Sequence, residues 1–530
     1  MLVVGSGAAA FSAAITAKNR GASVIMLEKA AEIGGTTARS GGGYWIPNNR
    51  YQREAGYEDD RAQCLRYMAR CSYPHLYNPD DARLGLPARE YALLAAYYDN
   101  AADMVEHFSD IGALASMPEI NWTGKPQVDY LDHLPENGGI RGRSLYPRDP
   151  DGRLAMGAEL ISQLHNWAAS NGIDIRVNCE ATKLLTDGAG AVTGLEARTS
   201  DGTVTMRARK GVIFGSGGFS HNPELMLRFQ RGPHYGGCAV PTNTGDFVRM
   251  AGAAGAGLGN MAGAFRADSM LEAALESPGG SSNVFYVAGD SVLIVNKYGK
   301  RIVDEKRNYN DRAMAHFAWD AQRGEWENLL TFLIFDERTA TLWQGFPPYP
   351  VSGTDMPYLI KEDTFEALRD SIAKRLHTLR AHTGGFSLEP SFLDGLNETV
   401  RAFNRYAADG VDPEFHRGDF AYDREWTTFP PTIPGATWPE TGTKNHTMHP
   451  LRDEGPYYAI ILAAGTLDTN GGPLIDENAQ ILDWEGRPIR GLYGAGNCVS
   501  SPTANSYWGA GSTIGPAMTF GYLAALHAIK

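Results

Sequence analysis

Near its beginning, the sequence carries a glycine-rich turn of a type that binds dinucleotides. The stretch "GSGAAA", Gly5 to Ala10, follows the apolar run "LVV" with the spacing GxGxxA. Gly5 permits a tight turn, Gly7 lets a pyrophosphate approach the backbone, and Ala10 keeps the following helix close to its strand. Ala8 and Ala9 open that helix, where free N–H groups favour an anion. Glu28, followed by Lys29, lies about 20 residues further on, where a ribose-binding carboxylate belongs.

A second stretch, "SYWGAGSTIGPAM" from Ser506 to Met518, combines groups that suit ligand binding. Tyr507 carries a phenol hydroxyl, and Gly511 presents an amide with no side chain in front of it. Ser512 or Thr513 is expected to cap a helix that Pro516 helps to start. The stretch therefore predicts a place where backbone and ligand come close.

The elements that must position these residues follow from the hydrophobic pattern. The runs "LVV" and "ASVIMLEK" predict strands on either side of an Ala-rich helix that ends at Gly21, which is a βαβ unit. After about residue 270 the pattern changes to β-like runs and two amphipathic helices, and strand and glycine signals return from "GPYYAIILAAG". We therefore predict an α/β chain with a discontinuous Rossmann-like domain, residues 1–270 and 452–530, and an inserted α+β substrate-binding, catalytic domain, residues 271–451.

Composition argues against several other classes of protein. The formal net charge is -13 and no Lys/Arg-rich block occurs, so we expect no nucleic-acid partner. No apolar run is long enough to span a bilayer. The five cysteines form no CxxC pair, and we expect neither disulfides nor a zinc site but a reducing, cytoplasmic compartment. His446 and His449 lack the helical context of a ligand pair, and we expect no metal.

Four motifs, in the expected order, resemble flavoproteins of the fumarate reductase superfamily. They are "GSGAAA" with Glu28, "GGTTARSGGG", "VIFGSGGF" and "GRPIRGLYGAGNC". The resemblance implies one bound FAD. No second GxGxxG occurs for a nicotinamide cofactor, and no histidine occupies residues 34–43, so the FAD is expected to be non-covalent. Besides the residues already named, the expected FAD contacts are Thr36, Thr37, Ser40, Gly41, Gly42, Gly43, Ala181, Gly215, Gly217, Gly496, Asn497, Ser512, Thr513 and Ile514.

Within that superfamily the chain resembles the 3-ketosteroid Δ1-dehydrogenases from end to end. The similar segments are "TTARSGGGYWIPNN", "GKRIVDEKRNYND", "GTLDTNGG" and "TIGPAMTFGYLAA". The resemblance implies oxidation of a saturated carbon–carbon bond next to a ketone, with one hydrogen leaving as a proton and the other as a hydride to flavin N5. It also implies an α/β flavoprotein fold and an electron acceptor of quinone or dye type, which the sequence does not identify.

The expected chemistry assigns roles to four residues. An α-hydrogen of a ketone becomes removable when donors hold the carbonyl oxygen and a base faces the α-carbon. The resemblance implies that Tyr507 and the Gly511 amide hold the oxygen, that Tyr309 is the base, and that Tyr130 supports it. Because an unperturbed tyrosine has a pKa of about 10, Tyr309 must be shifted or coupled to a relay.

Three alternatives remain open at this point. Trp508 and Ala510 depart from the residues usual beside that tyrosine. Trp508 could narrow the pocket for a smaller ketone, such as cyclohexanone or 4-oxocyclohexanecarboxylate, or it could face away. A reductase of activated alkenes is the second alternative, although Asp468 stands where fumarate reductases have a histidine. The third is a non-catalytic flavin-binding protein.

Overall fold

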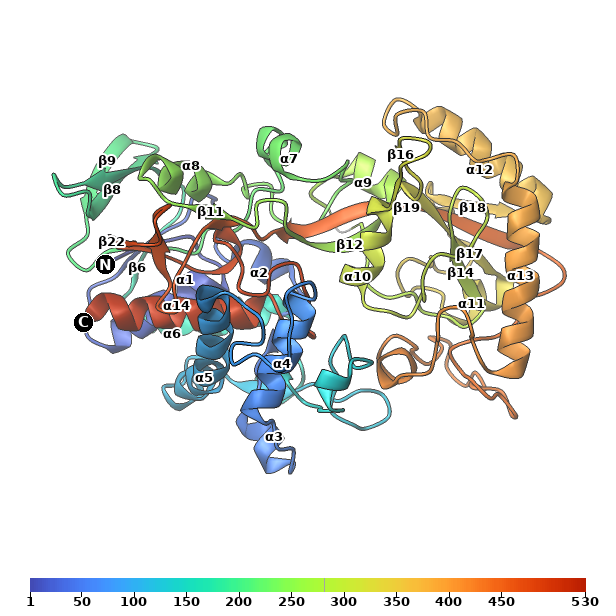
Figure 1. Cartoon of the computed structure of the whole chain (residues 1–530), viewed down its shortest axis with the longest axis horizontal. Helices are drawn as coiled ribbons and strands as arrows, with labels where there is room; N and C mark the ends of the chain where they lie inside the picture. The colour runs from blue at the N-terminus through green and yellow to red at the C-terminus, as the bar shows by residue number, and fades with distance from the viewer. Residues whose placement is uncertain (281) are drawn as a thin grey trace.

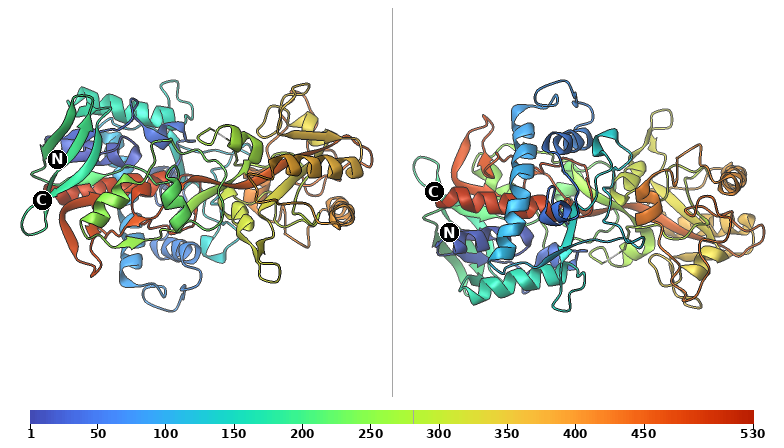
Figure 2. Two further views of the ribbon diagram at one scale, coloured as in Figure 1. Left: turned by 90° about the horizontal axis from the view of Figure 1, so that it is seen from above. Right: turned by 90° about the horizontal axis from the view of Figure 1, so that it is seen from below.

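The computed structural model describes residues 1–280 and 282–530. The molecule is elongated and has two lobes, and both termini lie in the same lobe (Figure 1). The long strand β19 (Tyr457–Thr469) runs from the middle of the molecule into the second lobe, as the views from above and below also show (Figure 2).

The first lobe is built on a six-stranded sheet with the order β21-β22-β10-β1-β2-β6. All neighbours are parallel except β21, which runs antiparallel to β22. Parallel strands end at one edge of a sheet, and ligands of such sheets bind at that edge. The strands are β1 (Leu2–Val4), β2 (Ile25–Leu27), β6 (Asp174–Arg176), β10 (Val212–Phe214), β21 (Gln480–Leu482) and β22 (Pro488–Gly494).

Two helices from opposite ends of the chain cover this sheet together. Helix α1 (Ala8–Asn19) is buried along most of its length, because its alanines let neighbouring elements approach closely. Helix α14 (Ile514–Ile529) packs directly on it: Ser12 Oγ donates to the Met518 carbonyl at 2.6 Å. A Cβ at Gly521 would lie 2.4 Å from the Ala9 carbonyl oxygen, so only glycine permits this approach. The end of the chain is thereby tied to the glycine-rich turn at its beginning.

Smaller elements complete the first lobe. Strands β7 (Glu180–Thr186), β8 (Val192–Thr199) and β9 (Gly202–Arg207) form an antiparallel meander. Strands β3 (Tyr44–Trp45), β5 (Ser144–Pro147) and β4 (Ser116–Pro118) form another small sheet. The remaining elements are α2 (Gly35–Arg39), α3 (Arg50–Glu54), α4 (Arg61–Ser72), α5 (Ala88–Asp110), α6 (Gly157–Ser170), α7 (Pro223–Phe229), α8 (Asp246–Ala253), β11 (Leu258–Gly259) and β20 (Gly472–Pro473).

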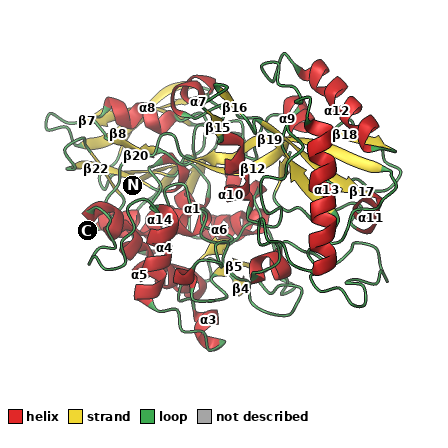
Figure 3. Ribbon diagram, turned by 45° about the vertical axis from the view of Figure 1, so that its right-hand side comes forward, coloured by secondary structure: helices red, strands yellow, loops and turns green. Residues whose placement is uncertain are grey.

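The second lobe contains an antiparallel sheet of six strands, in which β19 pairs with three neighbours. Amphipathic helices α12 (Phe365–Leu379) and α13 (Phe392–Asp409) lie beside it (Figure 3). The sheet consists of β13 (Asn283–Val284), β12 (Ala264–Met270), β19, β17 (Leu330–Asp336), β14 (Val292–Val295) and β18 (Leu359–Glu362). The other elements are α9 (Leu271–Glu276), α10 (Tyr309–Ala313), α11 (Glu337–Leu342), β15 (Trp319–Asp320), β16 (Glu325–Trp326) and a π-helical turn, Tyr422–Trp426.

These sheets give the architecture that the sequence predicts, a Rossmann-like α/β part and an α+β part. Strands β12 and β19 lie within the predicted ranges 1–270 and 452–530, yet both belong to the second sheet. The division into domains at 271–451 stays a proposal. Within residues 1–280 and 282–530, no helix is both long and apolar enough to cross a membrane.

Candidate active site

A cavity of about 450 Å³ opens at the carboxyl edge of the first sheet and is lined by residues of both lobes. A volume of this size is typical of a site for a cofactor or other small molecule. Its lining includes every residue that the sequence assigns to cofactor or catalysis except Ala10 and Ser512. Ala10 instead packs under the turn: a Cβ at Gly215 would lie 2.7 Å from its amide nitrogen, which is the close helix–strand contact expected of it.

The glycine-rich turn leaves no room for side chains. Gly5 has φ +103°, and a Cβ there would lie 2.4 Å from the Gly215 carbonyl oxygen, so the ends of β1 and β10 are in near contact. Gly7 precedes α1, and Thr37 Oγ1 accepts a hydrogen bond from the Ala8 amide at 3.2 Å. Backbone is thus exposed to the cavity along the whole turn, as a bound pyrophosphate requires.

Glu28 follows strand β2 and points into the same network. Its carboxylate accepts from Ser6 Oγ at 2.6 Å and from the Ala30 amide at 2.8 Å, and Ser6 Oγ in turn accepts from the Gly34 amide at 2.9 Å. The two bonds to the carboxylate leave acceptor sites on it for ribose hydroxyls. Lys29 also lines the cavity, but its ammonium is paired with Asp246 at 2.7 Å.

We expect Glu28→Gln to weaken FAD binding about 10- to 100-fold, because hydrogen bonds to a charged group contribute roughly 1.5–3 kcal/mol. Titration of the apoprotein with FAD, followed by flavin fluorescence, measures the change. Glu32→Gln is the matched control, since Glu32 is exposed on the same loop and outside the cavity. Equal affinities for the Glu28 and Glu32 variants would exclude a ribose contact by Glu28.

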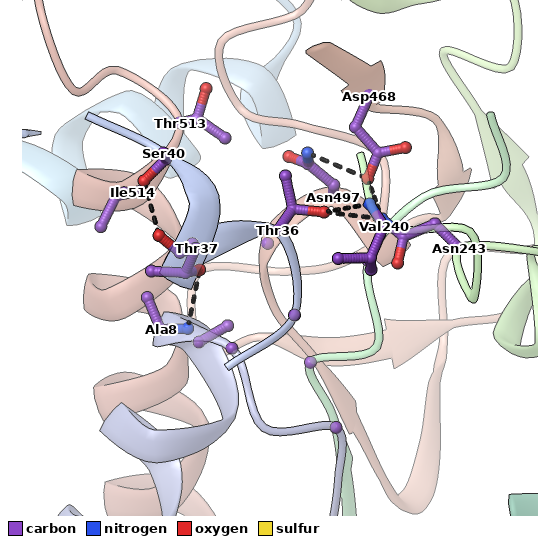
Figure 4. A pocket seen from close by; sticks show the side chains of 18 of the residues that line it. Ala8, Thr36, Thr37, Ser40, Val240, Asn243, Asp468, Asn497, Thr513 and Ile514 are labelled. Atoms are coloured by element: carbon purple, nitrogen blue, oxygen red, sulfur yellow. Dashed lines mark hydrogen bonds between the residues drawn. The ribbon is translucent and has the colours of Figure 1, made fainter. Parts of the chain in front are cut away.

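The segment from Gly35 to Gly43 borders the cavity beside this turn (Figure 4). Thr36 Oγ1 accepts from the Val240 amide at 3.2 Å, which joins the segment to a distant loop. Ser40 Oγ donates to the Thr37 carbonyl at 2.7 Å and accepts from the Gly42 amide at 3.1 Å. These bonds fix the conformation of a hydroxyl-rich segment at the cavity wall.

Asp468 is a buried anchor for several segments of the wall. Its carboxylate accepts from the Gly218 amide at 2.8 Å and from Ser220 Oγ at 2.9 Å. It also accepts from Asn243 Nδ2 at 2.7 Å (Figure 4). Asn497 Nδ2 is a further donor at 3.4 Å. Burial raises the pKa of this carboxyl, and the hydrogen bonds oppose that rise. The acceptor sites of the Asp468 carboxylate are therefore occupied by donors of the protein itself.

The cavity fits FAD in its chemistry. Thr513 Oγ1 is buried at the wall and has no partner among the described residues, so it is free to bond a ligand. In the described part of the chain, no group of three or more His, Cys, Asp or Glu side chains is arranged to hold a metal. Glycines, which let a ligand reach the backbone, are frequent in the lining: Gly5, Gly7, Gly35, Gly41, Gly42, Gly43, Gly215, Gly217, Gly496 and Gly511.

At the other end of the cavity, three tyrosines from three different segments face one another. Tyr130 OH donates to Tyr309 OH at 3.2 Å. The Tyr507 ring stacks on the Tyr130 ring with centroids 5.5 Å apart and meets the Tyr309 ring edge-on at 5.3 Å. All three side chains are at most 6% exposed. The predicted catalytic tyrosines are thus brought together at one wall.

The surroundings of the three tyrosines raise the pKa of Tyr309, the residue predicted to be the base. Burial raises the pKa of Tyr309 well above its ordinary value, and the nearby phenols of Tyr507 and Tyr286 raise it further, while the hydrogen bond from Tyr130 lowers it. Burial likewise raises the pKa of Tyr130 and Tyr507. With raised pKa values all three phenols are neutral at pH 7, so each hydroxyl can donate as well as accept a hydrogen bond.

The "SYWGAGSTIGPAM" stretch places Tyr507 and Gly511 on this wall. Gly511 has φ +95°, and a Cβ there would lie 2.4 Å from the Tyr44 amide nitrogen, so only glycine fits. Its amide makes no hydrogen bond to another described residue. The predicted helix cap is wrong: Ser512 Oγ bonds the Gly509 backbone at 2.8 Å, and Thr513 has helical dihedral angles, from which its side chain does not reach the first amides of α14.

Trp508 points away from the cavity. It is fully buried, its indole N–H donates to Ser72 Oγ at 2.9 Å, and its ring packs 5.2 Å from that of Trp45. Its carbonyl accepts from the Tyr130 amide at 3.0 Å. Trp508 therefore does not narrow the pocket. Its carbonyl instead joins the backbone of Tyr130 to the segment that carries Tyr507.

Sequence reasoning missed several parts of the wall. The aromatic residues Tyr146, Phe285 and Tyr286 and the side chains of Cys238, Val240, Asn243 and Leu467 all line the cavity. Tyr286 directly follows Phe285 in "NVFYVAG", and such an aromatic pair beside a strand is ordinarily core. The other residues carry no local signal, because their contacts come from distant segments.

The sequence and fold are similar to those of known flavoproteins. Residues 1–514 match the family model described as FAD binding domain. The chain is 31% identical to a 4-oxocyclohexanecarboxylate 2-dehydrogenase of Sinomonas cyclohexanicum, over 99% of this chain and 92% of the relative. It is 30% identical to a 3-oxosteroid 1-dehydrogenase of Mycobacterium tuberculosis, over 99% and 97%. Among solved structures, a 3-ketosteroid delta1-dehydrogenase of Sterolibacterium denitrificans with 1,4-androstadiene-3,17-dione superimposes with a TM-score of 0.80 at 27% identity, covering 99% of this chain and 98% of the other.

Proposed function

Because this chain belongs to the FAD-binding flavoprotein family that contains the 3-oxosteroid 1-dehydrogenases, and is an FAD-dependent dehydrogenase, we propose that it desaturates a carbon–carbon bond next to a ketone, most specifically the C1–C2 bond of a 3-ketosteroid. The observation that carries this proposal is the wall where Tyr130, Tyr309 and Tyr507 converge beside the unpaired Gly511 amide.

In the proposed reaction the Tyr507 hydroxyl and the Gly511 amide hold the ketone oxygen. Both donors strengthen their bonds as enolate charge develops, which lowers the barrier to removal of the α-proton. Tyr309, acting as a phenolate, takes that proton. Bound FAD supplies the acceptor for the hydride that leaves the β-carbon, so two electrons and one hydrogen pass to the cofactor.

Tyr130 supports the base through the hydroxyl contact at 3.2 Å. A phenol that donates to Tyr309 stabilises its ionised form, which is the state that accepts the proton. This hydrogen bond therefore opposes the rise in the pKa of Tyr309 that burial causes. Reoxidation needs an electron acceptor, for which we propose a quinone- or dye-like molecule.

The lining offers apolar surface to the ring of a ketone. Tyr146, Phe285, Tyr286 and Leu467 supply apolar surface to it. Among the described lining residues the basic side chains are Lys29, which is paired with Asp246, and Arg39, which donates to the Gly279 carbonyl at 2.6 Å. The Lys29 ammonium is thus paired with a carboxylate, whereas Arg39 donates to a neutral carbonyl and keeps its positive charge.

A smaller cyclic ketone is the second candidate. The 31% identity to a 4-oxocyclohexanecarboxylate 2-dehydrogenase favours it. The orientation of Trp508 removes the steric argument for a small ring, because this side chain lies outside the cavity. Reduction of an alkene, as in fumarate reductases, has less support, since Asp468 uses its acceptors on the protein.

Anaerobic mixing separates these candidates. We expect androstenedione to bleach the visible flavin absorbance of the holoprotein within one turnover, with cyclohexanone, 4-oxocyclohexanecarboxylate and succinate as comparisons. Bleaching by a small ketone alone would replace the steroid with the second candidate. Full flavin absorbance with every saturated substrate would contradict both dehydrogenase assignments and favour a flavin-binding protein without this activity.

A further inference from the structure

A buried ion pair lies directly beside the tyrosine wall and links the two segments that carry Tyr130 and Tyr309. Asp132 lies two residues after Tyr130, and Arg307 lies two residues before Tyr309. Arg307 Nη1 donates to Asp132 Oδ1 at 3.3 Å. The side chains of Asp132 and Arg307 are 6% and 17% exposed, so salt screens this pair little.

Asp132 also reaches a fourth tyrosine. Its Oδ2 accepts from the Tyr422 amide at 2.8 Å, and the Tyr422 ring meets the Tyr130 ring edge-on at 5.2 Å. One carboxylate therefore holds the guanidinium beside Tyr309 and the backbone of a residue that packs on Tyr130. Both carboxylate oxygens of Asp132 therefore accept hydrogen bonds from other segments, one from the Arg307 guanidinium and one from the Tyr422 amide.

Arg307 has further partners, two carboxylates and the imidazole of His133, which follows Asp132 in the chain. Its guanidinium contacts Asp423 at 3.1 Å and Asp304 at 3.5 Å, and His133 Nδ1 lies 3.2 Å from Nη1. The arginine therefore stays compensated if Asp132 loses its charge, whereas loss of the arginine leaves buried carboxylates without a cation. Asp132 is accordingly the position where the charged part of the link can be tested while Arg307 keeps its other partners.

We propose that Asp132 and Arg307 are positioning residues that hold Tyr130 and Tyr309 in hydroxyl contact. This inference rests on the proposed function for its kinetic consequence, but not for its structural one. Tyr130 is fixed from one side by the Trp508 carbonyl, which accepts its amide at 3.0 Å. The Asp132–Arg307 pair supplies the second fixed point, from the segment that carries Tyr309. A contact at 3.2 Å between two hydroxyls is at the long end for such a bond, so a small separation of the segments breaks it.

The test is a double-mutant cycle of Asp132→Asn and Tyr130→Phe. Asparagine keeps the size and an acceptor for the Tyr422 amide but removes the charge. We expect Asp132→Asn to lower kcat about 10-fold with KM within roughly threefold, because losing the contact that stabilises the ionised base acts on proton transfer rather than on binding. In the Tyr130→Phe background the same change is expected to lower kcat less than about threefold, since the contact is already absent. Losses that simply multiply, or an unchanged kcat of the single variant, would overturn the proposal.

Two further measurements keep the result independent of folding and of the reaction. Glu272→Gln removes a partly buried carboxylate that pairs with Arg375 away from the tyrosines, and is expected to leave kcat unchanged. NMR spectra of the holoprotein with ¹³Cζ-labelled tyrosine report the hydroxyl contact directly. Asp132→Asn and the second variant, Arg307→Lys, are expected to shift the Tyr130 and Tyr309 signals together. Unshifted signals would refute the positioning role. If none of the ketones bleaches the flavin of the wild-type enzyme, only the proposed function is refuted.

Discussion

Tyr309→Phe is expected to retain bound FAD and to dehydrogenate its ketone about 10²- to 10⁴-fold more slowly than the wild type, the range that a general base contributes. The substitution removes one oxygen atom and leaves the ring that packs against Tyr507. The remaining wall can still bind the ketone through Tyr507 and Gly511. Stopped-flow measurement of anaerobic flavin bleaching, combined with the flavin-to-protein absorbance ratio, measures both expectations.

A matched control is Tyr349→Phe. Tyr349 is also a buried tyrosine of the second lobe, but its hydroxyl donates to the Ala288 carbonyl at 2.7 Å, and the residue does not line the cavity. Its loss is expected to change stability by about 1 kcal/mol and to leave bleaching rates near those of the wild type. Rapid bleaching by the Tyr309 variant would show that another group takes the proton.

The raised pKa of Tyr309 gives the bleaching rate a pH dependence. Burial favours the neutral phenol, and the base must be ionised to act. The rate of bleaching in the wild type is therefore expected to increase with pH through the alkaline range, as the Tyr309–Tyr130 pair loses its proton, and to fall as pH drops below that apparent pKa. Tyr309→Phe is expected to abolish this rise. A wild-type rate that is flat from neutral to alkaline pH would contradict a tyrosine base.

Local sequence patterns were sufficient for the cofactor end of the molecule. The spacing of Gly5, Gly7 and Glu28 is set by one βαβ unit, and each of these residues acts within that unit or against an adjacent strand end. Ala10 lies close to the end of a neighbouring strand, as its place in the motif predicts, because a small side chain lets backbones approach. The α/β architecture follows from such patterns and FAD binding from the resemblance that the motifs carry, and the family comparisons confirm both.

The tyrosine end could not be predicted from residue patterns alone. Tyr130, Tyr309 and Tyr507 come from three distant segments of the chain, and only the resemblance to ketosteroid dehydrogenases brought them together. Their roles as catalytic residues stay predictions. The direction of Trp508 depends on residues far away in the chain, Trp45 and Ser72. Asp468 is a similar case. The sequence shows that it stands in place of a histidine, but not that its carboxylate binds amide groups of distant loops.

Gly5→Ala is expected to produce a protein that is purified without FAD and rebinds it at least about 100-fold more weakly than the wild type. The alanine Cβ would lie 2.4 Å from the Gly215 carbonyl oxygen and 2.8 Å from its carbon, and both atoms belong to backbone that cannot rotate away. The φ of +103° adds strain for any L-residue. To admit the methyl group, the ends of β1 and β10 must separate, and these ends form the floor on which the pyrophosphate is expected to rest.

Two other glycines make this result interpretable. Gly21 has φ +85°, and a Cβ added there would have no neighbour within 4 Å. Gly21→Ala is therefore expected to lower the free energy of unfolding by about 1 kcal/mol and to retain bound FAD. At Gly7 the nearest atom to an added Cβ is Thr37 Oγ1, at 3.3 Å, so Gly7→Ala is expected to fold normally and to lose affinity by obstructing the ligand itself. FAD titration, with thermal unfolding of each apoprotein, separates strain from obstruction. Wild-type affinity in the Gly5 variant would mean that the cofactor does not use this turn, because no relaxation of side chains alone can relieve a clash with backbone.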